Sequence, residues 1–449
     1  MNKCAEHSGK SSAPHRIVIV GGGAGGLELA TRLGNVVGRK RRAEIVLIDR
    51  YATHFWKPLL HEAASGHIDP AQHDISYAAH AKRHSFSFIQ GTLSGLDSTE
   101  QSVTIAPLVD ERDVEIIPSR AIAYDTLILS MGSVTNFFGV AGAEKEALRL
   151  ENVEHAEQFR RRLLAACTRA DRKKTESDRS SGPLVNVNII GGGATGVELA
   201  ASVRDAVEHL AEYRFASLDP ASDVCVRVIE GNDRVLPGLS PDLSKSALHH
   251  LLRLNIEVLT QTRVTQVLSD RLVTADNQNL QSDLTLWAAG IAGAPALSTL
   301  PGLTLNRSGQ MLVKPTLQSV SDPHIFALGD CASLAPDFGA GWPVTAQAAH
   351  QQAVYLASAL VARLAGKQSS PFSYRDGGTL LSFGRAGAIG RIASHMPPMT
   401  IAVRGNLART LYALIYRRHL LFLTGTRRAG IATLSQWLKG FLSPPVRLH

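Results

Sequence analysis

The sequence predicts an α/β protein in which one strand–turn–helix unit occurs twice, followed by a C-terminal segment of amphipathic helices. Two observations lead to this prediction. The glycine-rich stretches at positions 21–26 and 191–196 each lie between a short apolar run and a helix-like run, and the segment 391–449 is rich in Arg but contains no Asp or Glu. The chain has 449 residues, against about 100–200 for a typical domain, so two or three domains are expected.

The first unit begins with the apolar, strand-like residues 16–20, which lead directly into the turn GGGAGG. In such a turn Gly21 permits the tight bend, Gly23 lets the backbone approach a pyrophosphate, and Gly26 lets the helix and the strand pack closely. The next strand-like run ends in Asp49. A carboxylate at this distance beyond Gly26 is placed to hydrogen-bond the ribose of a dinucleotide.

The second unit repeats this order further along the chain. The glycines at the three critical positions are Gly191, Gly193 and Gly196. The next strand-like run ends in Glu230. The gap from Gly196 to Glu230 is longer than usual, and a helix extension with a loop can take up the excess. Because an acid here binds ribose and repels a 2′-phosphate, Glu230 favours NAD(H) over NADP(H).

A single glycine-rich turn is weak support, since it can merely pack a strand against a helix. Two copies, each followed by a strand that ends in an acid, predict two bound dinucleotides. Two Rossmann-like dinucleotide-binding domains in one chain resemble a family of flavoproteins in which the first domain binds FAD and the second, inserted domain binds a nicotinamide nucleotide. The resemblance implies FAD and NAD(H) as cofactors. It assigns residues 1–135 and 305–390 to the FAD-binding domain, 136–304 to the NAD(H)-binding domain and 391–449 to the C-terminal segment.

Three further strand-like runs support this resemblance. One ends near Gly132 and resembles the strand that leaves the FAD domain. Another ends at Ala289 and Gly290 and resembles the strand that closes the NAD domain. The third ends in Asp330, which corresponds to the aspartate that contacts the ribityl chain of FAD.

The four cysteines, Cys4, Cys167, Cys225 and Cys331, lie far apart, and no pair has the spacing of a redox dithiol or a zinc knuckle. Reduced, buried thiols are expected, and no metal site is predicted. Many relatives of this fold pass electrons to a disulfide near the flavin. The corresponding stretch, residues 53–66, contains no thiol, so a different electron acceptor is expected.

Residues 53–66, with 21–33 and 342–351, closely resemble the type II NADH:quinone oxidoreductases, single-chain flavoproteins that oxidise NADH without pumping protons. Residues 346–351 match the AQxxxQ quinone-site motif of this family. The resemblance runs from about residue 16 to the C-terminus. It implies hydride transfer from the nicotinamide to flavin N5, followed by two-electron reduction of a membrane quinone.

The resemblance also implies roles for individual residues. Gln347 and Gln351 lie one helical turn apart, so both amides can face one cavity and hydrogen-bond a quinone carbonyl or the flavin edge. Ala346 and Gln347 are expected beside FAD. Lys57 either approaches the flavin or covers the surface. His350 lies between the two glutamines but points off their shared face.

Glu198 follows the second glycine turn, and two interpretations of it stay open. Its carboxylate can simply stabilise the helix by interacting with the positive end of the helix dipole. The family resemblance instead places Glu198 near the nicotinamide and the quinone as a catalytic, proton-handling residue.

The C-terminal segment holds all of the chain's excess positive charge, which gives a net charge of +8. Residues 403–418 fit a helix with an apolar face, and a second apolar stripe follows. The stripe residues are Leu407, Leu411, Leu414, Ile415, Ile431, Leu434, Leu438, Phe441 and Leu442. Neither helix reaches the ~18 uncharged apolar residues of a membrane span.

These helices are therefore expected to lie on an anionic membrane surface. The alternative is that they pack on the protein's own core or across a homodimer. No nucleic-acid partner is expected, because no recognition module is visible. The N-terminal stretch 1–15 lacks an apolar run, so we expect a peripheral protein on the cytoplasmic face of the bacterial inner membrane.

Two other functions stay open. A soluble NAD(P)H-dependent flavoprotein reductase of an iron–sulfur partner would ignore quinones and lack a lipid-binding tail. A non-catalytic flavin/NADH redox sensor would show negligible turnover with any quinone.

Overall fold

The computed structural model describes residues 14–175, 182–395, 398–442 and 445–447. The chain forms two compact units. Unit 1 consists of Met1–His54, Ile75–Gly132 and Gly293–Tyr374, and unit 2 consists of Phe55–Asp74, Ser133–Ala292 and Arg375–His449.

This division differs from the predicted domain boundaries. Residues 55–74 and 375–390, expected in the FAD-binding domain, belong to unit 2, and residues 293–304 belong to unit 1. The first difference arises because helix α2 (Leu60–Ser65) packs on α5 (Val153–Thr175) and α6 (Ala194–Tyr213). Residues 375–390 belong to unit 2 because the strand at residues 378–382 pairs with the strand at residues 388–395. The cofactor that each unit binds stays a prediction.

Unit 1 is built on a five-stranded parallel sheet. Its strands in spatial order are β22 (Ile325–Ala327), β11 (Thr126–Leu129), β1 (His15–Val20), β2 (Ala43–Asp49) and β5 (Ser87–Gln90). The register pairs Val18 with Leu127 on one side and with Val46 on the other. Strands of a parallel sheet are buried on both faces, which explains the apolar run at the start of the first predicted unit.

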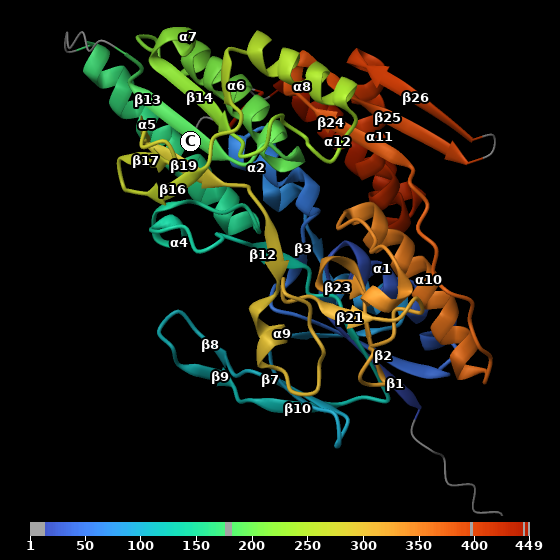
Figure 1. Ribbon diagram of the computed structural model, residues 1–449. Helices are drawn as coiled ribbons and strands as arrows, with labels where there is room; N and C mark the ends of the chain where they lie inside the picture. The colour runs from blue at the N-terminus through green and yellow to red at the C-terminus, as the bar shows by residue number, and fades with distance from the viewer. Residues whose placement is uncertain (1–13, 176–181, 396–397, 443–444, 448–449) are drawn as a thin grey trace, which may run out of the picture. The chain divides into compact units, whose positions relative to one another are not determined.

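Helices α1 (Ala24–Leu33) and α10 (Ala346–Leu364) pack against each other in unit 1 (Figure 1). The Thr345 hydroxyl caps α10 by accepting a hydrogen bond from the Ala348 N–H at 3.2 Å. The other elements of unit 1 are β3 (Thr53–His54), β4 (Ile75–Ser76), α3 (Tyr77–His84), β6 (Leu93–Asp97), β7 (Ser102–Ile105), β8 (Leu108–Val109), β9 (Glu115–Ile117), β10 (Arg120–Ala123), α9 (Pro295–Thr299), β21 (Met311–Val313) and β23 (Ala332–Leu334).

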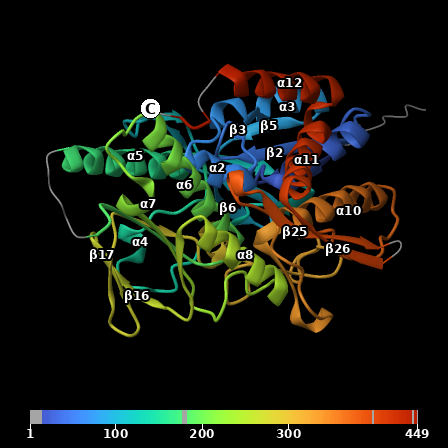
Figure 2. The same cartoon turned by 90° about the horizontal axis from the view of Figure 1, so that it is seen from above.

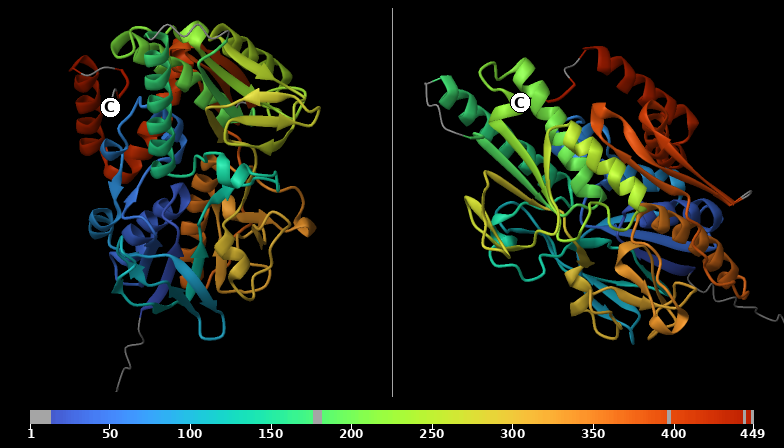
Figure 3. Two further views of the ribbon diagram at one scale, coloured as in Figure 1. Left: turned by 90° about the vertical axis from the view of Figure 1, so that its left-hand side faces the viewer. Right: turned by 45° about the horizontal axis from the view of Figure 1, so that its top comes forward.

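Unit 2 repeats the arrangement with a four-stranded parallel sheet, in the order β15 (Ile256–Leu259), β14 (Val224–Ile229), β13 (Val185–Ile190) and β19 (Leu284–Trp287). Helices α5 and α6 pack against this sheet (Figure 3). The other elements of unit 2 before residue 375 are β12 (Ser133–Thr135), α4 (Ala143–Glu146), α7 (Pro220–Asp223), α8 (Pro241–Arg253), β16 (Val264–Val267), β17 (Arg271–Thr274), β18 (Asn279–Gln281) and β20 (Ile291–Gly293).

The C-terminal part of unit 2 is an antiparallel sheet followed by two helices. The elements are β24 (Gly378–Ser382), β25 (Ala388–His395), β26 (Pro398–Arg404), α11 (Gly405–Thr424) and α12 (Thr426–Leu442). Helix α11 packs on β25 and β26 (Figure 2). The predicted helical segment, residues 391–449, begins instead with the end of β25 and with β26, where β-branched side chains such as Ile392, Ile401 and Val403 suit a strand. Within the described residues, we find no helix that combines the length and the hydropathy of a membrane span.

Candidate functional site

The first glycine turn connects β1 to α1, as predicted, and Gly21 and Gly26 each have a distinct steric reason. Gly21 has φ +102°, and a Cβ there would lie 2.2 Å from the Ser130 carbonyl oxygen. A Cβ on Gly26 would lie 1.8 Å from the Gly21 carbonyl oxygen, so only glycine lets the helix approach the strand. Gly23 has open space where its Cβ would be. A phosphate fits this opening at the N-terminus of α1.

Asp49 closes this turn. Its Oδ2 accepts a hydrogen bond from the Gly22 N–H at 2.6 Å, and its Oδ1 accepts one from the Tyr51 N–H at 2.9 Å. The carboxylate therefore lies at the ends of β1 and β2, where ligands bind in parallel α/β sheets.

Two buried side chains bond the carbonyl oxygen of the same residue, Gly22. The Tyr77 hydroxyl donates to the Gly22 carbonyl at 2.7 Å, and His54 Nδ1 lies 2.9 Å from the same oxygen. Burial lowers the pKa of His54 to about 4, so the ring is neutral and donates from Nδ1. The sequence pattern predicted a role for neither residue, and no local signal could have done so, because both approach the turn from distant segments.

Asp330 lies in a helical turn after β22 that neighbouring glutamines fix. The Gly329 N–H donates to Gln352 Oε1 at 2.7 Å, and Gln310 Nε2 donates to the Asp330 carbonyl at 2.8 Å. Gln352 is buried on α10, and sequence analysis missed it. Helix α10 therefore positions the loop of Asp330 within unit 1.

The predicted residues Ala346, Gln347 and Gln351 all lie on the first turns of α10. Gln347 Oε1 accepts a hydrogen bond from the Tyr374 hydroxyl. His350 Nδ1 lies 2.5 Å from Glu28 Oε2 on α1. His350 therefore anchors α10 to α1.

The second glycine turn connects β13 to α6 in the same manner. Gly191 has φ +109°, and its Cβ would lie 2.7 Å from the Ala289 backbone nitrogen. A Cβ on Gly196 would lie 2.0 Å from the Gly191 carbonyl oxygen, whereas Gly193 again faces open space. The predicted residues Ala289 and Gly290 thus lie directly behind this turn, and Gly290 has φ +70°.

Glu230 closes the second turn as Asp49 closes the first. Its Oε2 accepts a hydrogen bond from the Gly192 N–H at 2.7 Å. Its Oε1 accepts two from Asn232, from the backbone N–H at 2.8 Å and from Nδ2 at 2.5 Å. Arg234 donates to the Pro237 carbonyl at 3.0 Å, so its guanidinium is engaged by its own loop.

Glu198 lies one turn into α6 and contacts the C-terminal part of unit 2. Its Oε1 accepts a hydrogen bond from the Ser382 N–H at 3.0 Å. Loss of hydration raises the pKa of Glu198 to about 8; the bonds from Ser382 and from the Tyr412 hydroxyl oppose this rise, and the charge of Glu62 adds to it. A carboxyl with this pKa is suited to exchanging a proton near neutral pH.

The remaining predicted residues fall in different units. Gln347 and Gln351 belong to unit 1, while Glu198 and Lys57 belong to unit 2. Lys57 is exposed at the start of a short helical turn. Gly132 ends the second segment of unit 1 with φ +73°. The catalytic grouping of the glutamines with Glu198, and the contact of Lys57 with flavin, stay predictions.

Among the described residues, Cys167 and Cys331 are free and buried, and Cys225 is free and partly exposed. Burial raises the pKa of Cys167 to about 12 and that of Cys331 to about 11. Both thiols are therefore poor nucleophiles at neutral pH. This agrees with the expectation of buried, reduced thiols; Cys4 lies outside the described residues.

Two parallel-sheet units, each with a glycine turn closed by a carboxylate, define a protein that binds two dinucleotides. The sequence matches the pyridine nucleotide-disulphide oxidoreductase family over residues 15–353. The chain belongs to this broad family.

Comparison with curated proteins narrows the family. The type II NADH:quinone oxidoreductase of Haemophilus influenzae is 37% identical over 442 residues, which cover 96% of this chain and 99% of the relative. The enzyme Ndh of Mycobacterium tuberculosis, which carries the same name, is 27% identical and covers 96% of this chain and 88% of its own length. The chain therefore belongs to the type II NADH:quinone oxidoreductase family.

A solved structure supports the fold. NDH2 from Plasmodium falciparum, in complex with NADH, matches with a TM-score of 0.80 and 18% sequence identity, over 96% of this chain and 100% of that chain.

The raised pKa of Glu198 predicts how stability depends on pH. Its folded-state pKa of about 8 lies above the ordinary value of 4.5, so the unfolded chain holds fewer protons between these values. Stability contributed by the protonated group is present below about pH 4.5 and is lost as the pH rises to about 8. Glu198→Gln should therefore match the wild-type melting temperature near pH 5 and exceed it near pH 9.

Thermal melts of the FAD-loaded protein from pH 5 to 9 test this prediction. Glu212→Gln, an exposed position on the same helix, is the matched control and should show no such divergence. If the difference in melting temperature between Glu198→Gln and the wild type stays constant from pH 5 to 9, the proposed effect of burial on the pKa of Glu198 is contradicted.

Proposed function

We propose that this protein oxidises NADH and reduces a quinone by two electrons through bound FAD, without pumping protons. One observation carries the proposal: the chain holds two separate glycine turns, each closed by its own carboxylate, and so has one turn for each dinucleotide. Membership of the type II NADH:quinone oxidoreductase family supports the reaction, because the relatives are named for it.

Unit 1 has the features needed to hold FAD, which would supply hydride acceptance and electron transfer when bound. The open space at Gly23 and the N–H groups at the start of α1 would receive the pyrophosphate. Asp49 would accept a hydrogen bond from the adenosine ribose. Asp330 would face the ribityl chain from the turn that Gln352 fixes.

Unit 2 has the features needed to hold NADH. Gly193 and the start of α6 would receive its pyrophosphate, and Glu230 its ribose. A 2′-phosphate would meet the negative charge of Glu230. Because Arg234 is bonded to the Pro237 carbonyl, it is not held towards such a phosphate, and this supports NADH over NADPH.

Quinone reduction needs neutral hydrogen-bond partners and a source of protons. We assign the first role to Gln347 and Gln351, whose amides can bond a quinone carbonyl without adding charge. Glu198 would handle protons: with a pKa of about 8 it is mostly protonated at pH 7 and can donate from its carboxyl oxygen.

Anaerobic stopped-flow spectroscopy tests the reaction. The purified protein should be yellow, NADH should bleach the flavin absorbance, and a short-chain quinone should restore it within the turnover time. NADPH should reduce the flavin much more slowly. Rapid bleaching without reoxidation by quinones, but with reoxidation by an iron–sulfur protein, would favour a soluble reductase instead. Reoxidation by no acceptor would indicate a sensor.

We further propose that the C-terminal helices bind the cytoplasmic face of the bacterial inner membrane. Helix α11 has two different faces. The face that packs on the rest of unit 2 carries aromatic residues with polar groups. Tyr412 bonds Glu198, Tyr416 contacts His73, and His419 packs on Trp56 with ring centroids 3.9 Å apart.

The opposite side of α11 and one side of α12 expose large apolar side chains. These are Leu407, Leu414, Ile415, Leu421, Ile431, Leu434 and Leu438. Exposed arginines of the two helices, among them Arg417, Arg418, Arg427 and Arg428, accompany them. The side chains of Phe441 and Leu442, also predicted in the stripe, lie outside the described residues. Apolar side chains beside arginines match the chemistry of an anionic lipid surface.

Liposome sedimentation tests the membrane proposal. Replacing Ile431, Leu434 and Leu438 together by Ser should weaken the free energy of membrane binding by on the order of 1 kcal/mol or more per side chain. The fraction of protein bound to anionic vesicles should therefore fall sharply. A control with Val114→Ser and Ile116→Ser, exposed apolar residues of β9 and its turn, should bind as the wild type does. Equal binding by both variants would show that α12 is not the contact.

A further inference from the structure

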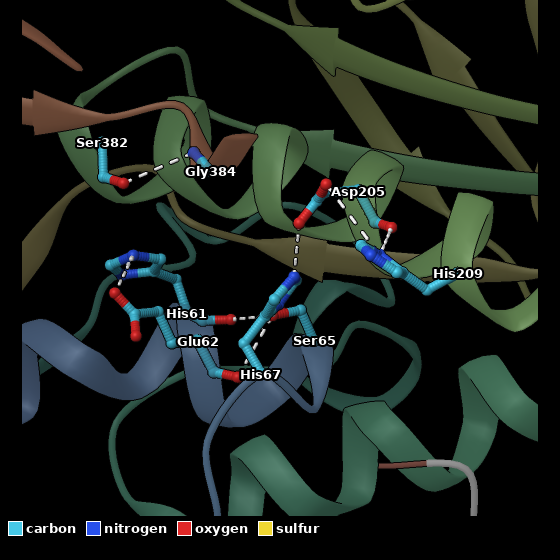
Figure 4. Close-up of polar contacts among 8 residues, drawn as sticks. All are labelled: His61, Glu62, Ser65, His67, Asp205, His209, Ser382 and Gly384. Atoms are coloured by element: carbon cyan, nitrogen blue, oxygen red, sulfur yellow. Dashed lines mark hydrogen bonds and ion pairs between the residues drawn. The ribbon is translucent and has the colours of Figure 1, made fainter. Parts of the chain in front are cut away.

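Unit 2 contains a cluster of two histidines and one aspartate that the proposed reaction does not use. His67 follows α2, and Asp205 and His209 occupy successive turns of α6 (Figure 4). One ring nitrogen of each histidine and one carboxylate oxygen of Asp205 all lie within 4.8 Å of one another. Asp205 and His209 are buried, and His67 is partly exposed.

Hydrogen bonds fix the orientation of the His67 ring. The Ser65 hydroxyl lies 2.9 Å from the His61 carbonyl oxygen, 3.1 Å from the Glu62 carbonyl oxygen and 2.7 Å from His67 Nδ1. His67 Nε2 donates to Asp205 Oδ2 at 2.6 Å, because the carboxylate oxygen can only accept. A metal ion between these two atoms would replace this proton.

The His209 ring is fixed in the same way. Its Nδ1 lies 2.7 Å from the Asp205 backbone carbonyl, which can only accept, so Nδ1 carries the proton. The same nitrogen lies 4.0 Å from Asp205 Oδ1. Nε2 of His209 is buried, and among the described residues it has no hydrogen-bond partner. A buried imidazole lone pair without a partner is costly.

We infer that His67, Asp205 and His209 form a binding site for a divalent transition-metal ion, with Zn²⁺ the best match. Two imidazoles and one carboxylate are a ligand set that Zn²⁺ uses, with water at the fourth position. Histidines that bind metals commonly donate their other ring nitrogen to an oxygen. His209 already does so, to the Asp205 carbonyl, and His67 Nδ1 lies within hydrogen-bond distance of the Ser65 hydroxyl oxygen.

The adjustment that the ion requires is small. Tetrahedral Zn²⁺ with bonds of about 2.0–2.1 Å places its ligand atoms about 3.3 Å apart. The 2.6 Å His67–Asp205 contact must open by about 0.7 Å, and separations of up to 4.8 Å must shorten by up to about 1.5 Å. Rotation of the partly exposed His67 side chain provides this movement. The bound ion would tie α2 to α6, two helices that already pack together.

Zinc binding to the full-length, FAD-loaded protein tests the inference. After treatment with EDTA, the wild type should bind one more Zn²⁺ per chain at micromolar free Zn²⁺ than His67→Asn or Asp205→Asn, as measured by dialysis and metal analysis. Zn²⁺ should raise the melting temperature of the wild type, and Mg²⁺ should not, since Mg²⁺ prefers all-oxygen sites.

His249→Asn is the matched control, because it removes an exposed histidine of α8 in the same unit. It should keep the Zn²⁺ content and the thermal shift of the wild type. Retention of flavin and a single cooperative melting transition without Zn²⁺ establish that the variants are folded. Equal Zn²⁺ content and equal thermal shifts in the wild type, His67→Asn and Asp205→Asn would overturn the inference, as would a wild type that binds no Zn²⁺.

Discussion

One hydrogen bond, made once in each unit, organises the candidate sites. The peptide N–H in the middle of each glycine turn donates to the acid that ends the next strand, from Gly22 to Asp49 at 2.6 Å and from Gly192 to Glu230 at 2.7 Å. The bond depends on the sheet register, because pairing of Val20 with Ile48 and of Ile190 with Ile229 brings turn and acid together. A shift of the register by one residue would point the carboxylate to the other face of the sheet.

Helix α11 links two parts of the proposed function within unit 2. Its inner side places the Tyr412 hydroxyl on Glu198, the residue that we propose handles protons. Its outer side exposes the apolar residues that we propose contact lipid. One helix can therefore hold the proton-handling carboxyl and face the phase in which a long-chain quinone dissolves.

The sequence predicted the parts of the site that local pattern controls. The apolar runs and glycine turns were confirmed as β1–α1 and β13–α6, and the helix that carries Gln347 and Gln351 was confirmed as α10. Contacts between distant segments could not be predicted, because a single sequence carries no pairing information. Tyr77 on Gly22, Gln352 on Gly329 and His67 on Asp205 belong to this class. The compact units divide the chain differently from the predicted domains for the same reason, since the packing of α2 and the pairing of β24 with β25 join distant segments.

Nucleotide binding to two conservative variants tests the central claim, that each acid controls its own dinucleotide. Asn and Gln keep the size of Asp49 and Glu230 but remove the charge that holds the turn and the ribose. Asp49→Asn should lower FAD content, whereas Glu230→Gln should retain FAD and weaken NADH binding while narrowing the preference for NADH over NADPH. Loss of FAD in Glu230→Gln, or full FAD content with unchanged affinity in Asp49→Asn, would contradict the account.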